Sequence, residues 1–111
     1  MASERITEQL VRKRLDSLGY GLPDNDIAVV EQKSQIDAVK RLLKNASKTG
    51  KGGKGAPEFI ISSAGSPDFL VVIECKADVK HHESAKRDAP ASYAVDGALH
   101  YAAHLSKEFN V

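Results

Sequence analysis

The chain has little cysteine, few aromatic residues and almost no net charge, and the first of these shortages excludes whole classes of protein. Its single cysteine, Cys75, rules out an internal disulfide and a zinc cluster built on cysteines. No apolar run approaches the ~18 residues of a membrane-spanning helix. Residues 1–5 also lack the apolar core of a signal peptide. Together these absences predict a protein without a membrane partner, in the reduced setting of the cytoplasm.

The length and charge of the chain set broad limits on what it can be. Its 111 residues suffice for one small domain with its own core. The net charge of +1 identifies no partner, but its distribution is uneven. Residues 44–55 hold four lysines and no acid: Lys44, Lys48, Lys51 and Lys54. This lysine- and glycine-rich stretch predicts a flexible loop that either attracts phosphate or serves only as a tether.

The pattern of apolar residues predicts helices on both sides of a β-hairpin. Helical spacing indicates helices over 3–18, 34–45 and about 90–108, with Ser3 and Ser34 as N-caps and Pro90 in the first turn of the last. The first helix would bury Ile6, Leu10, Val11, Leu15 and Leu18, with Glu8 near the edge of that stripe.

Strands are predicted over 58–62 and 68–76, while a short strand at 27–30 stays open. Because residues 69–73 are continuously apolar, both faces of the sheet should be covered. The fold class is therefore α/β.

Ionisable residues at one end of this hairpin form the candidate site. Alternate residues of a strand face the same side, so Glu74 and Lys76 point together, and Cys75 points away as a small buried apolar residue. A second acid could be Asp68 or Glu58. Asp68 precedes Glu74 by six residues on one strand, which places them about 20 Å apart.

Glu58 is the acid that the geometry favours. It lies on the partner strand, opposite about Val71 or Val72 and one diagonal step from Glu74. Two carboxylates can hold Mg²⁺, and a lysine beside them can orient or deprotonate an attacking water. The sequence thus predicts a metal-dependent hydrolytic site made by Glu58, Glu74 and Lys76.

The residues that form this site resemble the signature of the PD-(D/E)xK nuclease superfamily. Pro57-Glu58 is followed, after fifteen residues, by Glu74-Cys75-Lys76. The resemblance covers most of residues 3–111 and is greatest to nuclease segments at the N-terminus of type I-like restriction enzymes and fused restriction–methyltransferase proteins. It implies a restriction-endonuclease-like mixed sheet flanked by helices. It also implies hydrolysis of double-stranded DNA that depends on Mg²⁺, with Mn²⁺ as a substitute.

The resemblance also implies roles for individual residues. Glu58 and Glu74 would ligate Mg²⁺, Lys76 would orient the water, and Glu8 would complete the site from the first helix. Tyr101 would support the site from the last helix. Independently of the resemblance, the positive charge of the loop predicts DNA contacts by Lys48, Lys51 and Lys54.

Two departures from the family pattern support a rival interpretation. The first acid is glutamate, where aspartate is commoner, and Gly97 stands where related nucleases often carry a glutamine four residues before the tyrosine. These departures suit a DNA-binding module that kept the fold and has weak or no catalysis. A small interaction domain without a nucleic-acid role is a third hypothesis, which rests on the near-zero net charge.

The end of the chain suggests a missing strand. Nucleases of this family add at least one strand after the last helix, and Asn110-Val111 reads as its beginning. We therefore expect one nuclease-like domain over 1–111, truncated after the last helix. It would be a fragment of a larger restriction or restriction–modification protein, with other domains or subunits as partners.

Overall fold

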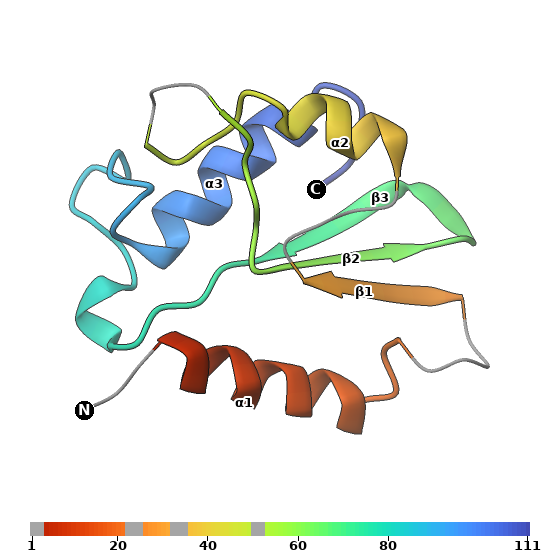
Figure 1. Ribbon diagram of the computed structural model, residues 1–111, viewed down its shortest axis with the longest axis horizontal. Helices are drawn as coiled ribbons and strands as arrows, with labels where there is room; N and C mark the ends of the chain where they lie inside the picture. Colours follow the sequence, from red (N-terminus) through yellow and green to blue (C-terminus); the bar gives the residue numbers. More distant parts are fainter. Residues whose placement is uncertain (1–3, 22–25, 32–35, 50–52) are drawn as a thin grey trace.

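A three-stranded antiparallel sheet with helices on both faces forms the centre of the molecule (Figure 1). The computed structural model describes residues 4–21, 26–31, 36–49 and 53–111. The strands lie in the order β1-β2-β3, and α1 covers one face while α2 and α3 cover the other. The elements are α1 (Glu4–Ser17), β1 (Ile27–Glu31), α2 (Asp37–Leu43), β2 (Phe59–Ser63), β3 (Ser66–Ile73), the 3₁₀ turn η1 (Val79–His81) and α3 (Ala94–Leu105).

The predicted α/β class, with helices flanking a sheet, is confirmed, and the segment left open at 27–30 is strand β1. One parallel contact adjoins the antiparallel strands among the residues described. Asn110 forms an isolated bridge with Phe69, on the outer edge of β3. Its backbone N–H donates to the carbonyl of Asp68 at 2.7 Å, and its carbonyl accepts from the N–H of Leu70 at 2.8 Å.

The register of the hairpin differs from the predicted one. Phe59 pairs with Ile73, so Glu58 lies opposite Glu74 rather than opposite Val71 or Val72. The cause is an irregularity near the turn, where Ser63 pairs with Ser66 but Ser62 pairs with Leu70. Residues 67–69 therefore have no partner in β2, and the rest of β3 is displaced along it.

Alternation along the strands builds two cores. One face of the sheet packs its buried residues against α2 and α3 in a cluster formed by Val39, Leu43, Ala46, Ile60, Leu70, Tyr101 and Leu105. The other face packs Phe59, Ile61 and Cys75 against Leu15 of α1. The expectation that both faces are covered is confirmed, as is the burial of Cys75, which is 3% exposed.

Helix α1 turns a different face inward from the one predicted. Leu15 is buried, but Ile6, Leu10 and Leu18 are 50%, 63% and 56% exposed, so their predicted burial is wrong. The inward face instead runs from Glu4 and Glu8 to Val11 and Leu15. The Thr7 hydroxyl on this face donates to the Lys76 carbonyl at 3.0 Å. A polar end of the helix therefore lies against the segment that follows β3.

The predicted ends of several elements are also corrected. β3 ends at Ile73, so Glu74 and Lys76 lie in the extended segment beyond the strand. Helix α3 begins at Ala94 after the N-cap Tyr93, and Pro90 belongs to the preceding turn. The predicted caps Ser3 and Ser34 fall outside the described residues. Among those that are described, no helix has the length and apolar character needed to cross a membrane.

Candidate active site

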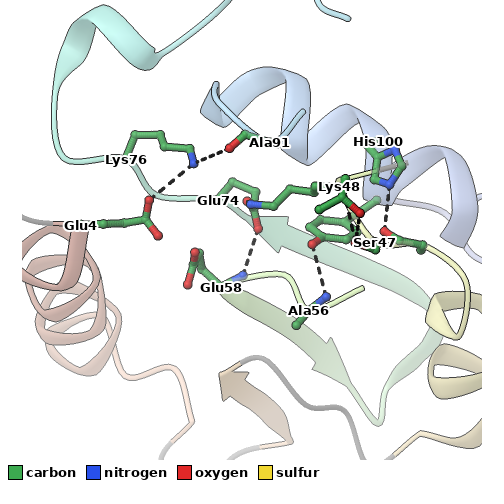
Figure 2. Close-up of polar contacts among 12 residues, drawn as sticks. Glu4, Ser47, Lys48, Ala56, Glu58, Glu74, Lys76, Ala91 and His100 are labelled. Carbon is green, nitrogen blue, oxygen red and sulfur yellow. Dashed lines mark hydrogen bonds and ion pairs between the residues drawn. The ribbon is translucent and has the colours of Figure 1, made fainter. Parts of the chain in front are cut away.

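Glu58 and Glu74 lie side by side at the end of the hairpin (Figure 2). Glu58 directly precedes β2 and Glu74 directly follows β3. The Glu74 Oε1 atom accepts a hydrogen bond of 3.0 Å from the backbone N–H of Glu58. The antiparallel pairing of the two strands thus fixes the spacing between these residues. Asp68, the acid set aside on distance, is exposed at the far end of β3 near Asn110.

Helix α1 adds two further carboxylates to Glu58. One oxygen each of Glu4, Glu8 and Glu58 lie within 4.8 Å of one another. Glu4 was not predicted as a site residue. Its signal was present, because residues four apart share a helix face, and Glu4 stands one turn before Glu8. The apolar spacing of the helix obscures this signal, because it predicts a different inward face.

This grouping changes the acidity of Glu58, which is 7% exposed. Burial raises the pKa of Glu58 to about 7 from its ordinary 4.5, helped by a hydrogen bond to Glu4 and by the charges of Glu8 and Glu74. A carboxyl group with such a pKa holds its proton part of the time near neutrality. Glu8 also lies 3.5 Å from Arg5, so basic side chains balance part of the negative charge of the cluster, and a bound cation would balance more of it.

Lys76 lies beside the same cluster. Its Nζ is 3.5 Å from Glu4 Oε1 and donates to the Ala91 carbonyl at 3.2 Å. The side chain of Lys76 is 16% exposed. It thus connects three segments, which are the start of α1, the end of the hairpin and the turn before α3. Lys76, Glu74 and His82 also help line an open cavity of about 570 Å³.

Glu74 has a second partner that was predicted to contact DNA instead. Lys48 Nζ lies 2.8 Å from Glu74 Oε2, with side chains that are 18% and 1% exposed. Burial opposes the charged form of Lys48, but the hydrogen bond and charge of Glu74 outweigh it and raise the pKa of Lys48. Lys54 is exposed to solvent, and Lys51 lies outside the described residues.

Tyr101 holds the chain segment that leads to Glu58. Its hydroxyl accepts a 3.2 Å hydrogen bond from the backbone N–H of Ala56, and the residue is 2% exposed. His100, on the same helix, bonds through Nε2 to the Ala46 carbonyl at 2.8 Å. These two contacts attach the loop between α2 and β2 to helix α3. The loop delivers both Lys48 and Glu58 to the site.

With this geometry in place, the comparisons with known proteins identify one relative. The chain is 33% identical, over 120 aligned residues, to the type II restriction enzyme and methyltransferase RM.BcgI of Heyndrickxia coagulans. The aligned region covers 99% of this chain and 17% of that protein. No protein-family model matches the chain, and no solved structure matches it. The chain is thus similar to a small part of a restriction–modification enzyme.

The donor atoms of the site suit a hard divalent cation. Carboxylate oxygens are the side-chain ligands that Mg²⁺ prefers, and Mg²⁺ is held by few of them together with waters. The group formed by Glu4, Glu8 and Glu58 offers three such side chains from two elements, with Glu74 hydrogen-bonded to the backbone of Glu58. Neither histidine nor cysteine belongs to this group among the residues described. The site therefore fits Mg²⁺ or Mn²⁺ better than zinc.

Proposed function

We propose that this chain is the Mg²⁺-dependent DNA endonuclease domain of a restriction–modification protein. The observation that carries the proposal is the grouping of three carboxylates within 4.8 Å, beside Glu74 and Lys76 at the end of one hairpin. Such a site suits hydrolysis of a phosphodiester bond. Similarity to a restriction enzyme and methyltransferase supports DNA as the substrate.

Each residue of the site has a part in this proposal. Glu58 would hold the cation together with Glu4 and Glu8 of α1, and Glu74, which lies outside this group of three, would add a ligand from the end of β3. When bound, Mg²⁺ supplies charge neutralisation on the phosphate and acidifies a water. The ammonium group of Lys76 orients the attacking water and stabilises charge that develops on the phosphate oxygens. Its bond to the Ala91 carbonyl fixes it at the edge of the cavity that Glu74 also lines.

The proposal assigns double-stranded DNA as the partner and places the protein in the cytoplasm. The basic loop before β2 carries Lys54, which is exposed, and Lys51. We expect both to contact phosphates, since lysines that neutralise phosphates supply most sequence-independent affinity. Recognition of a DNA sequence would come from other domains or subunits.

Cleavage of supercoiled plasmid tests the proposal. The chain should nick the plasmid with Mg²⁺ or Mn²⁺ and stop when EDTA removes the ion. Lys76→Ala should lower the rate at least about 100-fold, because a positioned proton donor or acceptor contributes about that much. Lys80→Ala is the matched control, since Lys80 is exposed on the neighbouring turn η1. Equal nicking by the wild type and Lys76→Ala would overturn the proposal.

A DNA-binding module without catalysis is the second candidate. Two observations favour it, namely the ion pair that already neutralises Glu74 and the glycine at position 97 beside it. This candidate predicts DNA affinity that falls steeply with salt and no cleavage with either metal. Metal-dependent nicking that disappears in Lys76→Ala would exclude it.

We further propose that the domain belongs to a longer protein in which another strand follows along β3. The parallel bridge between Phe69 and Asn110 supports this proposal. An open apolar cavity of about 390 Å³ adjoins the bridge, between β3 and α3. Residues that line it include Val71, Val95, Leu99 and Val111. A strand that continues parallel to β3 would cover this surface.

A further inference from the structure

Both oxygens of the Glu74 carboxylate are held by the protein. Oε1 accepts from the backbone N–H of Glu58 at 3.0 Å, and Oε2 lies 2.8 Å from Lys48 Nζ. The Glu74 side chain is only 1% exposed. Removal of one partner of a buried ion pair is strongly disfavoured, so Lys48 holds the Glu74 carboxylate in its position and orientation.

The path of Lys48 to Glu74 depends on the glycine at position 97. A Cβ atom placed on Gly97 would lie 3.1 Å from Glu74 Oε2, 3.3 Å from Lys48 Cδ and 3.1 Å from the Pro90 carbonyl. A side chain at this position would therefore crowd both Glu74 and Lys48. Gly97 on α3 thus leaves the space that Lys48 of the facing loop occupies beside Glu74.

Tyr101 holds the lysine from another side. The Lys48 Nζ lies 5.9 Å from the centre of the Tyr101 ring, which is within the range of a cation–π interaction. The tyrosine hydroxyl also accepts from Ala56 in the segment that leads to Glu58. Lys48 thus reaches Glu74 beside the Tyr101 ring, with a side chain that is only 18% exposed.

We infer that Lys48 is a positioning residue of the proposed active site, which holds Glu74 in place, and that it is not a DNA contact. The inference rests on the proposed function. The contacts of Glu74 with Lys48 and with the Glu58 backbone leave a lone pair on each of its oxygens available to another ligand. The ammonium group of Lys48 thus holds this buried acid next to the group of Glu4, Glu8 and Glu58.

The two roles of a lysine predict different kinetics. Loss of a lysine that contacts a phosphate raises the Kd for DNA and reduces the slope of the salt dependence of binding by about one. Loss of a lysine that orients a site carboxylate lowers kcat and leaves the metal-free Kd for DNA unchanged. Loss of a partner that orients a metal ligand typically lowers metal affinity or activity about 10–100-fold.

The experiment compares Lys48→Met with Lys48→Arg, Lys54→Met and Lys40→Met. Plasmid nicking with Mg²⁺ gives kcat and KM, and fluorescence anisotropy with a labelled duplex in EDTA gives the Kd. Lys48→Met should lower kcat about 10–100-fold with an unchanged Kd, and Lys48→Arg should recover part of the loss. Lys54→Met should weaken DNA binding, whereas Lys40→Met, on the exposed side of α2, should match the wild type. A raised Kd with normal kcat in Lys48→Met would overturn the inference.

A readout that needs neither metal nor DNA separates this inference from the proposed function. Urea midpoints are measured for Lys48→Met, Glu74→Gln and the double variant. The double variant should lose less than the sum of the single losses, because each single change leaves a buried partner unpaired. Additive losses would overturn the role inferred for Lys48 and would leave the proposed function untouched. A wild-type chain that retains this coupling but cuts no DNA with Mg²⁺ or Mn²⁺ would instead overturn the proposed function.

Discussion

Glu58 combines two properties that single residues rarely share. Its carboxyl group is nearly excluded from water, and three other glutamates, Glu4, Glu8 and Glu74, act on it. The fold maintains this arrangement although it disfavours the ionised form of the group. Concentrated charge of this kind is typical of functional sites, where stability is given up for chemistry.

The raised pKa of Glu58 predicts a specific dependence of stability on pH. A carboxyl group whose folded pKa is about 7 instead of 4.5 stabilises the fold fully below pH 4.5. That contribution is lost as the pH rises through 7. Because glutamine imitates the protonated acid, the wild type should lose free energy of unfolding relative to Glu58→Gln between pH 5 and 8. The loss should be on the order of 3 kcal/mol.

Urea unfolding of both proteins in metal-free buffer at a series of pH values measures this difference. Glu31→Gln is the control, because Glu31 is exposed at the end of β1. Parallel pH profiles for the wild type and Glu58→Gln would contradict the assignment. Metal affinity should change in the opposite sense and increase across the same range, since a cation binds the ionised carboxylates.

How far single residues can be predicted from the sequence depends on the range of their contacts. Strand alternation and hairpin pairing are local rules, and they predict that Glu58, Glu74 and Lys76 lie at one end of the hairpin, where the structure has them. They do not predict the position of Glu4 or the partner of Lys48, since both depend on how a helix and a loop approach the sheet. The predicted register of Glu58 is wrong by two or three residues, because an irregular turn has no clear mark in the sequence.

At the level of elements, helix α1 decides whether the carboxylate group forms. It meets the sheet through Leu15 and the partly buried Val11, and through the bond from Thr7 to the Lys76 carbonyl. Glu4 and Glu8 are delivered by the same face. The carboxylate group therefore forms only when the helix packs against the sheet. Hydrophobic spacing alone did not indicate this face, because apolar residues occur on both sides of the helix.

Truncation of Leu15 should separate the helix from the site. Leu15→Ala removes a side chain that is 6% exposed and should lower the free energy of unfolding by about 2–4 kcal/mol. Leu10→Ala is the matched control, because Leu10 is 63% exposed and its loss should cost less than about 0.5 kcal/mol. Unfolding curves give these energies, and Mn²⁺ titration should show weaker binding in Leu15→Ala only. Equal effects of both substitutions would mean that α1 docks through another face.

On the scale of the whole molecule, the sheet has an apolar edge along β3. Asn110 is bonded to one end of β3, next to exposed apolar side chains such as Phe69 and Leu99, which are each 49% exposed. An exposed apolar sheet edge of this kind tends to pair with another strand. The proposed larger protein would provide that strand. Without it, we expect a second copy of the chain to pack against the same edge.

The isolated chain should therefore associate as its concentration increases. Leu99→Lys places a charge beside β3 and should weaken association, which sedimentation velocity measures. Val79→Lys is the control, since Val79 is 91% exposed but lies on η1, away from this edge. Association that responds equally to both changes would show that general hydrophobicity, rather than the β3 edge, is responsible.

The bond between Thr7 and the Lys76 carbonyl joins parts of the chain that are 69 positions apart. Under the proposed function, a molecule whose first helix has come loose would contain no complete set of acids. A partly unfolded copy would then bind DNA without cleaving it. Hydrolysis would be restricted to intact molecules, which is a safeguard that a nuclease built from a single continuous segment would not have.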